Sequence, residues 1–273
     1  MKLPPEFQFT QGSLQDFVDC QRRFQLRYVQ NLRWPAIEME PILETECYIQ
    51  RGVFFHRMIQ QHLLGVPAER LEALIKDPEL ENWWKNYLQQ VGFENISKMQ
   101  GRRYPELSLS APIDGYRLTA KYDLIWISPS GKTIIYDWKT WRTRPLRGWL
   151  NDRLQTHVYP YPLVQAGAHL NQGVAIQPED VEIVYWFANY PNQPETFIYS
   201  IVQYQSDQKY LRGLIERIHT LDENQVSLTT DERKCSYCVY RSLCDRGVQA
   251  GDMADFEGDW DAEEGLELSL IHI

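Results

Sequence analysis

Residues 133–140 read TIIYDWKT, and this stretch decides the fold that we expect. Its first four residues are β-branched or aromatic, which favours a buried β-strand. Asp137 and Lys139 are separated by one residue, so on a strand both side chains leave the same face of the sheet. Trp138 lies between them and is expected to point away from that face into the core. The stretch therefore predicts a core strand that carries a carboxylate beside an ammonium group.

The surrounding sequence predicts further strands and flanking helices. Residues 103–111 and 115–127 alternate in polarity and meet at Asp114-Gly115, a dipeptide that favours a tight hairpin. Other segments have apolar residues three and four apart, as amphipathic helices do. This order of elements predicts an α/β fold with a mixed β-sheet flanked by helices. Helices are expected at about 13–30 with Ser13 as N-cap, at 42–64 ending at Gly65, at 79–91, from about 150 with a kink or break at Pro160 and Pro162, and at 206–221; two more strands are expected at 181–188 and 196–202.

A second carboxylate is expected near Asp137. Asp123 lies in the preceding strand, and hairpin pairing can bring the two carboxylates together. Neighbouring carboxylates repel each other unless a cation neutralises them, and Mg²⁺ or Mn²⁺ prefers such oxygen ligands. Such an ion lowers the pKa of a bound water, which Lys139 can hold in place. Taken alone, the Asp-x-Lys motif is short, and a surface ion pair explains it equally well.

Three further motifs accompany this pair. Residues 51–56 (RGVFFH) end in His56 on a predicted helix, and Glu106 precedes the strand that carries Asp123. Gln155 and Tyr159 are four residues apart, so they share one face of a helix. Taken singly, the histidine is also compatible with a core position, and the glutamine and tyrosine with simple packing.

Together the motifs resemble those of the RecB-like branch of the PD-(D/E)XK nucleases, which includes the CRISPR-associated exonucleases. The resemblance spans about residues 13–246 and includes the strand motif at residues 136–140 (YDWKT) and the helix motif at residues 155–159 (QTHVY). The sequence departs from the pattern at Ala120, where a glycine is common, and at Pro160, which directly follows the helix motif.

The resemblance implies a restriction-endonuclease-like α/β core that hydrolyses phosphodiester bonds of DNA, acting as an exonuclease on single strands. It implies that Lys139 positions the attacking water, and that Gln155 and Tyr159 contact the substrate or that water. Glu106 is left open as a second-metal ligand or as a group that supports the ligands. The implied ligands of Mg²⁺ or Mn²⁺ are His56, Asp123, Asp137 and the backbone carbonyl of Trp138.

The chain has five cysteines, and the expected compartment is reducing, so clustered cysteines are considered first as metal ligands. Cys235, Cys238 and Cys244 lie close together in sequence, and a fourth ligand is missing locally. The resemblance supplies Cys20 as that ligand and implies a C-terminal lobe that holds a 4Fe–4S cluster. A structural Zn²⁺ site needs the same four thiolates and is the alternative. Cys47 is left over and is expected to be a buried structural thiol.

The charge of the chain is unevenly distributed. The net charge is −9, but residues 247–273 hold eight acids and no Lys or Arg, which leaves 29 acids against 28 basic residues elsewhere. Residues 139–153 carry five basic residues and one acid, and such a local patch suits contact with phosphate groups. We expect weak DNA contacts from Trp141, Arg142, Arg144 and Arg147, with plain packing as the alternative for the tryptophan.

The expected domain organisation has four regions. They are an N-terminal helical region (1–100), a nuclease core (101–222), a cysteine lobe (223–250) and an acidic tail (251–273) that either stays solvated, docks on a protein partner or covers the basic groove. No apolar run is long enough to span a membrane, and residues 1–5 lack the apolar region of a signal peptide, so we expect a cytoplasmic protein. The pathways that this resemblance suggests are DNA repair or recombination and CRISPR adaptation. The alternative is a DNA-binding or adaptor subunit whose nuclease activity depends on partners.

Overall fold

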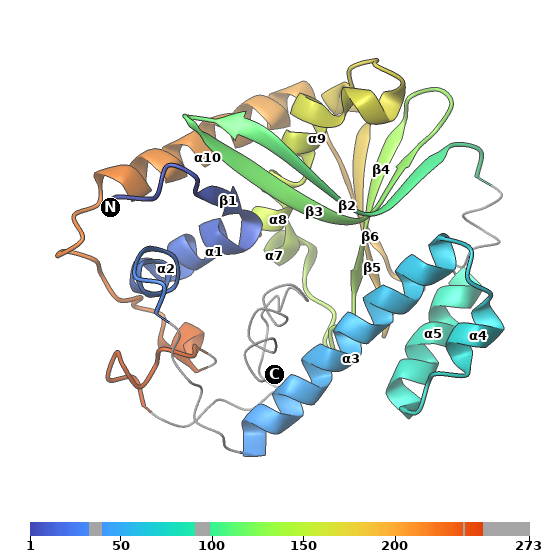
Figure 1. The fold of residues 1–273 in the computed structure, drawn as a ribbon, viewed down its shortest axis with the longest axis horizontal. Coiled ribbons are helices and arrows are strands. Elements are labelled where there is room, and N and C mark those ends of the chain that lie inside the picture. Colours follow the sequence, from blue (N-terminus) through green and yellow to red (C-terminus); the bar gives the residue numbers. More distant parts are fainter. Residues whose placement is uncertain (33–39, 91–98, 237, 248–273) are drawn as a thin grey trace. The chain divides into compact units, whose positions relative to one another are not determined.

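The computed structural model describes residues 1–32, 40–90, 99–236 and 238–247 (Figure 1). The chain forms two compact units, each built from segments that are distant in sequence. The first unit comprises Met1–Gln50, Pro112–Leu118 and Lys209–Ile273, and the second comprises Arg51–Ala111 and Thr119–Gln208. In the described part of the chain, no helix is both long enough and apolar enough to cross a membrane.

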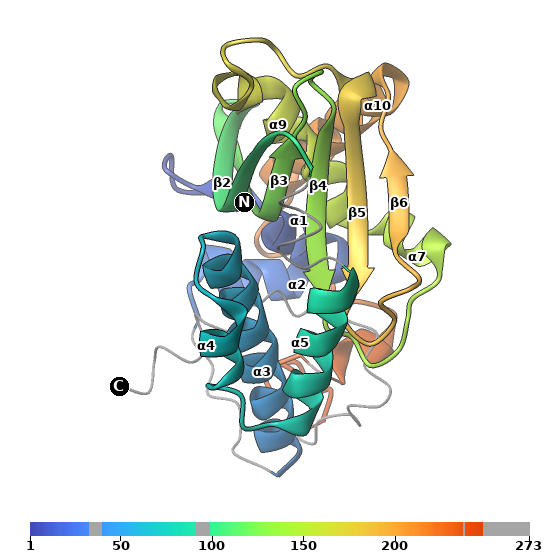
Figure 2. The ribbon, with the colours of Figure 1, turned by 90° about the vertical axis from the view of Figure 1, so that its right-hand side faces the viewer.

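A mixed β-sheet provides the frame of the fold, as the sequence predicts (Figure 2). The strand order is β1-β3-β4-β5-β6, and β2 pairs with β3. β3 and β4 are antiparallel, β4 and β5 are parallel, and β5 and β6 are antiparallel. A parallel pair needs a long crossover connection, and the helices that follow β4 provide it. The strands are β1 (Gln8–Thr10), β2 (Arg102–Ile113), β3 (Tyr116–Ile127), β4 (Thr133–Lys139), β5 (Val181–Phe187) and β6 (Glu195–Ile198).

The hairpin between β2 and β3 turns at the predicted dipeptide. Asp114 and Gly115 have φ angles of +44° and +81°, as a two-residue hairpin turn with positive φ at both positions requires. Counting outward from this turn places Ser110 opposite Thr119, and Oγ1 of Thr119 donates a hydrogen bond of 3.1 Å to Oγ of Ser110. The turn chemistry therefore sets which residues of the two strands are neighbours.

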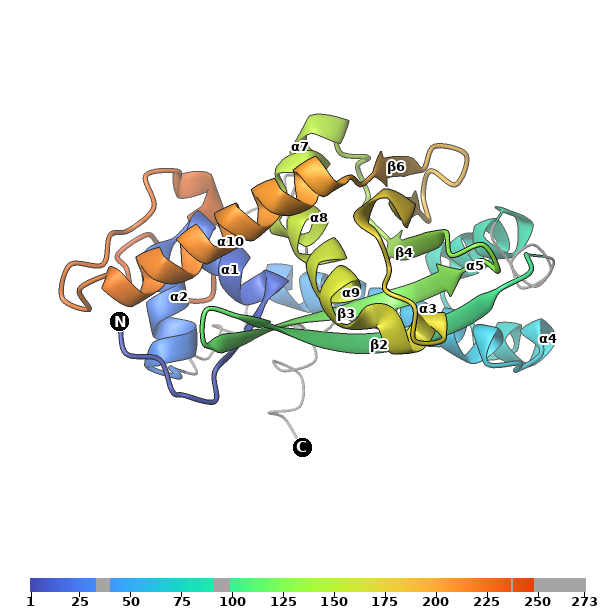
Figure 3. The same ribbon diagram turned by 90° about the horizontal axis from the view of Figure 1, so that it is seen from above.

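Helices cover both faces of the central strands in the second unit (Figure 3). On one face, Trp138 of β4 contacts Tyr87, with ring centroids 6.2 Å apart, and Trp186 of β5 stacks on Phe55 at 6.5 Å. On the other face, the hydroxyl groups of Tyr185 and Thr156 are 2.8 Å apart. Trp138 is buried, as expected for the residue between Asp137 and Lys139. The helices around these contacts are α3 (Glu40–Leu63), α4 (Ala68–Glu72), α5 (Pro78–Gln90), α7 (Arg147–Asp152), α8 (Leu154–Val158) and α9 (Pro160–Ala166).

The predicted helix from about residue 150 is interrupted at a different position from the one that its prolines indicate. Arg153 is extended, with φ −74° and ψ 137°, and separates α7 from α8. Pro160 is instead the first residue of α9. A backbone N–H at this position makes no hydrogen bond within its own helix, so the proline removes none. Because Tyr159 keeps helical dihedral angles, Gln155 and Tyr159 still share one helical face. Two short 3-10 helices follow, η2 (Gly167–Asn171) and η3 (Pro178–Asp180).

The boundary between the last strand and the last helix differs from the prediction. β6 ends at Ile198, and α10 (Ile201–Thr220) begins five residues before the predicted start at 206. The backbone N–H of Gln203 donates to Oγ of Ser200 at 3.2 Å, so a serine cap starts the helix there. The predicted strand at 196–202 is therefore wrong beyond residue 198, because local capping outweighs the β-propensity of Ile201 and Val202.

The N-terminal helical segment of the first unit is divided into three pieces. Its N-cap is Thr10, and Ser13, the predicted cap, completes a capping box: the Thr10 side chain accepts from the N–H of Ser13 at 3.1 Å, and Oγ of Ser13 accepts from the N–H of Thr10 at 2.9 Å. Cys20 is extended and interrupts the predicted helix over 13–30. The pieces are α1 (Gln11–Asp19), α2 (Gln21–Phe24) and the π-helix η1 (Gln25–Val29); the 3-10 helix η4 (Glu232–Cys235) also belongs to this unit.

Two further expectations have clear outcomes. The helix predicted over 42–64 is α3, and Gly65 follows it with a φ angle of +99°, as predicted for a C-terminal glycine. Cys47 is exposed on α3, so the prediction of a buried thiol is wrong. Its sequence neighbours could not indicate this, because burial on a long helix depends on which turns other elements cover. The acidic segment 251–273 lies outside the described residues.

Candidate functional site

A buried polar cluster joins β4 to α8 in the second unit. Nζ of Lys139 is 3.0 Å from Oδ2 of Asp137 and donates to Oε1 of Gln155 at 2.8 Å. Nε2 of Gln155 donates to Oδ1 of Asp137 at 2.8 Å, and the Tyr159 hydroxyl donates to the same oxygen at 3.0 Å. All four side chains are buried. The sequence-predicted strand pair and helix pair therefore form one hydrogen-bonded cluster.

Asp123 lies where β3 and β4 stop pairing. The paired residues run from Ile127 and Thr133 to Leu124 and Tyr136, whereas β4 remains paired with β5 as far as Lys139. Asp123 is the next residue beyond this last pair on β3, and its Oδ2 accepts the backbone N–H of Trp138 at 2.7 Å. A side-chain carboxylate thus satisfies a backbone donor that would otherwise be unpaired at this point. The pairing of β3 with β4 therefore ends next to Asp123 and Asp137.

Three potential metal ligands meet around Asp123. His56, Glu106 and Asp123 each offer a ligand atom, and these atoms lie within 4.8 Å of one another. His56 comes from α3, and its Nδ1 is 3.1 Å from Oδ1 of Asp123. Oxygen ligands with one imidazole suit Mn²⁺, and carboxylates with water suit Mg²⁺. The donor chemistry therefore fits a divalent cation, and it includes Glu106, whose role the sequence left open.

Glu106 reaches this group through an unusual backbone conformation. Its φ angle is +51°, which is uncommon for a residue other than glycine, and it directly follows Pro105 within β2. Such a conformation re-aims a side chain relative to a regular strand. The carboxylate of Glu106 also forms an ion pair with Lys121 of β3, with Nζ 2.9 Å from Oε2.

The electrostatics of the three groups reflect their proximity. Burial disfavours the charged imidazole, but the charge and hydrogen bond of Asp123, with the charges of Glu106 and Asp137, together raise the pKa of His56 to about 9. Burial raises the pKa of Asp123, but the charge and hydrogen bond of His56, the backbone N–H of Trp138 and the charge of Lys139 together lower it overall. Burial and the charge of Asp123 raise the pKa of Glu106, and Lys121 partly opposes this effect. Without a metal ion, a proton on His56 balances the carboxylate beside it.

The arginines predicted to contact DNA have partners within the protein. Arg144 and Arg147 both form ion pairs with Glu195 of β6, the latter at 2.7 Å. The Arg147 guanidinium also lies over the ring of Phe197, 4.2 Å from its centroid. Nζ of Lys139 lies 5.0 Å from the centroid of the Trp141 ring, so this tryptophan borders the polar cluster. Arg142 is exposed, and its backbone carbonyl accepts from the hydroxyl of Tyr190 at 2.8 Å.

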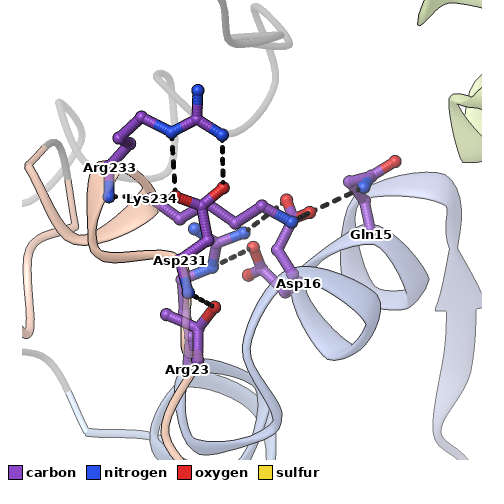
Figure 4. A network of polar contacts seen from close by, with 8 residues as sticks. Gln15, Asp16, Arg23, Asp231, Arg233 and Lys234 are labelled. Carbon is purple, nitrogen blue, oxygen red and sulfur yellow. Dashed lines mark hydrogen bonds and ion pairs between the residues drawn. The ribbon is translucent and has the colours of Figure 1, made fainter.

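The four cysteines predicted to form a cluster all belong to the first unit. Burial and the charges of Cys238, Cys20 and Cys244 raise the pKa of Cys235, so the other three thiols act electrostatically on this one. Charged contacts join the helix that precedes Cys20 to the segment that precedes Cys235 (Figure 4). In this network, Lys234 contacts Asp19 at 2.8 Å, and Arg23 contacts Asp19 at 3.0 Å and Asp16 at 2.6 Å.

Two features of the site were not predicted from the sequence. The first is Lys121, whose signal was its spacing of two residues from Asp123, which places both side chains on one face of β3. The second is the hydrogen bond from the Trp138 backbone to Asp123, which depends on where the strands separate. No sequence pattern marks that point.

Comparisons with known proteins place this geometry in a family. The model of the PD-(D/E)XK nuclease superfamily matches residues 8–245. A solved structure from Eubacterium rectale, named provisionally as an exonuclease, is similar over 85% of this chain and 91% of its own, with 10% identity and a TM-score of 0.51. The solved structure of a protein named SSO0001 is similar over 89% of this chain and 88% of its own, with 15% identity and a TM-score of 0.40. A search of curated proteins finds no match. Since the family model covers most of the chain, the protein belongs to the PD-(D/E)XK nuclease superfamily.

Proposed function

We propose that the protein is a metal-dependent deoxyribonuclease that acts as an exonuclease on single-stranded DNA, in DNA repair or recombination or in CRISPR adaptation. The observation that carries the proposal is the buried cluster around Asp137 and Lys139, which adjoins the group of His56, Glu106 and Asp123. A structural ion pair does not require a second carboxylate and an imidazole beside it. Family membership supports a nucleic acid as substrate, and the similar structure from Eubacterium rectale favours an exonuclease.

The residues have separate roles in this proposal. His56, Asp123, Asp137 and the backbone carbonyl of Trp138 would hold Mg²⁺ or Mn²⁺, which polarises the scissile phosphate and lowers the pKa of a bound water. Lys139 holds the attacking water and stabilises the charge that develops on the phosphate oxygens. Gln155 orients Lys139 and Asp137 through the two ends of its amide, and Tyr159 supports the same carboxylate.

A cleavage assay tests the proposal. Purified protein is incubated with Mn²⁺ and single-stranded DNA labelled at either end, and the wild type is compared with Asp137→Ala and Lys139→Ala. The matched control is Lys132→Ala, because Lys132 is exposed and pairs with Glu182 away from the cluster. We expect cleavage by the wild type and the control, and loss of at least about 100-fold in the two site variants. Equal cleavage by all four proteins would exclude a nuclease that uses this site.

The cysteines are proposed to bind a 4Fe–4S cluster through Cys20, Cys235, Cys238 and Cys244. Four thiolates in one unit fit such a cluster, and they fit Zn²⁺ equally well in ligand number. The resemblance to the RecB-like branch favours iron. Iron and sulfide analysis with an absorption spectrum of anaerobically purified protein distinguishes the two metals. Colourless protein that contains zinc and lacks iron would overturn the cluster.

The surface that receives the DNA strand is proposed to include Trp141, Arg142, Arg144 and Arg147. Trp141 borders Lys139, so a base stacked near this ring would place its phosphate close to the cluster. Arg144 and Arg147 share one carboxylate, that of Glu195, so these two arginines and the glutamate together keep a net positive charge. Weaker DNA binding by Arg142→Ala, with a shallower dependence on salt, would support this surface.

A further inference from the structure

We infer that the ammonium group of Lys121 takes the place of a second metal ion, so that the active site binds one divalent cation per chain. This inference concerns the metal site of the proposed nuclease and therefore rests on the proposed function. In many phosphoryl-transfer enzymes, two divalent ions about 3.5–4 Å apart share carboxylate ligands. Here the carboxylate of Glu106 already contacts a cation that belongs to the protein.

The placement of Lys121 is built into the hairpin. Lys121 and Asp123 are two residues apart on β3, so both side chains lie on the same face as the ligand group. Glu106 and Asp123 come from the two strands of the hairpin, and their ligand atoms lie within 4.8 Å of each other. From its position on β3, the long side chain of Lys121 reaches Glu106 on β2.

The ion pair has the geometry of a charge-assisted hydrogen bond. Nζ of Lys121 is 2.9 Å from Oε2 of Glu106, and the Glu106 side chain is 14% exposed while that of Lys121 is 35% exposed. Lys121 is therefore the more exposed partner of this ion pair. A second ion bound to Oε2 of Glu106 would meet this ammonium, and one of the two cations would have to leave.

Counting formal charges supports one ion. Glu106, Asp123 and Asp137 contribute three negative charges, and Lys121 and Lys139 contribute two positive charges, with His56 neutral when it binds a metal. One divalent ion gives the site a charge of +1, which the single negative charge of a phosphodiester then cancels. Two ions would give +3 before substrate binds. Without Lys121, two ions would give only +2, so removal of this lysine makes a second ion more favourable.

Manganese stoichiometry tests the inference with the full-length protein. Mn²⁺ is titrated into the wild type, Lys121→Met and Lys121→Arg, and bound ions are counted by calorimetry and by electron paramagnetic resonance. Methionine keeps the apolar stem of the side chain and removes the charge, whereas arginine keeps the charge. Asp123→Asn shows which of the counted ions belong to this site. Circular dichroism and thermal unfolding confirm that each variant is folded.

We expect one site-bound Mn²⁺ in the wild type and in Lys121→Arg. In Lys121→Met a second ion should bind with affinity raised by about 10- to 100-fold, and the resonance spectrum should show a magnetically coupled pair. Two ions in the wild type, one ion in Lys121→Met, or no ion that depends on Asp123 would overturn the inference. The cleavage assay is separate: a wild type that binds one ion and cuts no DNA refutes the nuclease and leaves the stoichiometry standing.

Discussion

Oε1 of Gln155 accepts a hydrogen bond of 2.8 Å from Nζ of Lys139, across the interface between α8 and β4. The other end of the same amide donates to Asp137 at 2.8 Å. A side-chain amide is suited to this position because it offers an acceptor to the ammonium and a donor to the carboxylate at once. Gln155 therefore determines how Asp137 and Lys139 are oriented, although it carries no charge.

Replacement of Gln155 by alanine should lower the rate of cleavage more than it weakens DNA binding. The ammonium and the carboxylate keep their mutual contact but lose their shared support, and we expect kcat to fall about 10- to 100-fold. Steady-state kinetics on a short single strand measures the effect. Gln165→Ala is the matched control, because Gln165 is exposed on the neighbouring helix α9. Equal losses in kcat for both variants would refute the orienting role.

Replacement of Tyr159 by phenylalanine should destabilise the second unit and reduce activity. The hydroxyl donates to Asp137 at 3.0 Å and accepts from Gln155 at 2.6 Å, and all three side chains are buried. Its removal leaves buried polar atoms with one partner fewer, which costs about 1–3 kcal/mol in the free energy of unfolding. Chemical denaturation gives this value directly. A variant as stable and as active as the wild type would show that the hydrogen bonds contribute nothing.

The free energy of unfolding should fall as pH falls below about 6.5, partly because of His62. Burial lowers the pKa of His62 in the folded protein, while the charge of Glu69 opposes this shift. Between the folded and unfolded pKa values the unfolded chain binds more protons, so stability decreases as pH decreases through this window. One proton limits the slope to about 1.4 kcal/mol per pH unit.

Denaturant unfolding at pH 5 and pH 7.5 isolates this contribution when His62→Gln is compared with the wild type. The glutamine does not titrate and keeps a polar group near the Tyr87 hydroxyl, which lies 3.1 Å from Nδ1 of His62. We expect the variant to lose less stability on acidification than the wild type. Identical losses in both proteins would assign the acid sensitivity to other groups.

Two glycine-to-alanine changes should act in opposite directions. Gly101 has a φ angle of +150°, and a Cβ atom there would lie 2.4 Å from the carbonyl oxygen of Ile127. Gly101→Ala should therefore destabilise the protein by about 1–3 kcal/mol. Gly148 lies in α7, and a Cβ atom there would point into open space, so Gly148→Ala should stabilise by about 0.5–1 kcal/mol. Thermal unfolding of both variants checks the pair, and equal shifts would contradict it.

Local sequence chemistry determined much of the sheet. Asp114-Gly115 favours positive φ at two successive residues, so the hairpin and its register follow from two positions. The β-branched run before Asp137 predicts a buried strand, and its period of two separates Trp138 from Asp137 and Lys139. The spacing of four between Gln155 and Tyr159 likewise survives the break at Arg153, because α8 and Tyr159 retain helical dihedral angles.

Other features depend on contacts between distant segments. The pattern of residues could not indicate that Cys20 interrupts a helix, that Cys47 is exposed, or that Ser200 starts α10. Each of these outcomes depends on a balance between the intrinsic helix or strand propensity of a residue and the hydrogen-bonding or packing partners that the fold supplies. Propensities of ordinary residues differ by less free energy than such partners contribute.

The sequence by itself determined the candidate site residues: the acids, the lysine and the helix pair are all present as motifs. Only the tertiary structure decided how they meet. The pairing of β3 with β4 ends at Leu124 and Tyr136, and beyond it Asp123 accepts the N–H of Trp138. Glu106 has a positive φ angle, and its side chain reaches His56 and Lys121. The physical reason is that backbone hydrogen bonds must be satisfied wherever strands part, and the position of that parting is set by packing over the whole sheet.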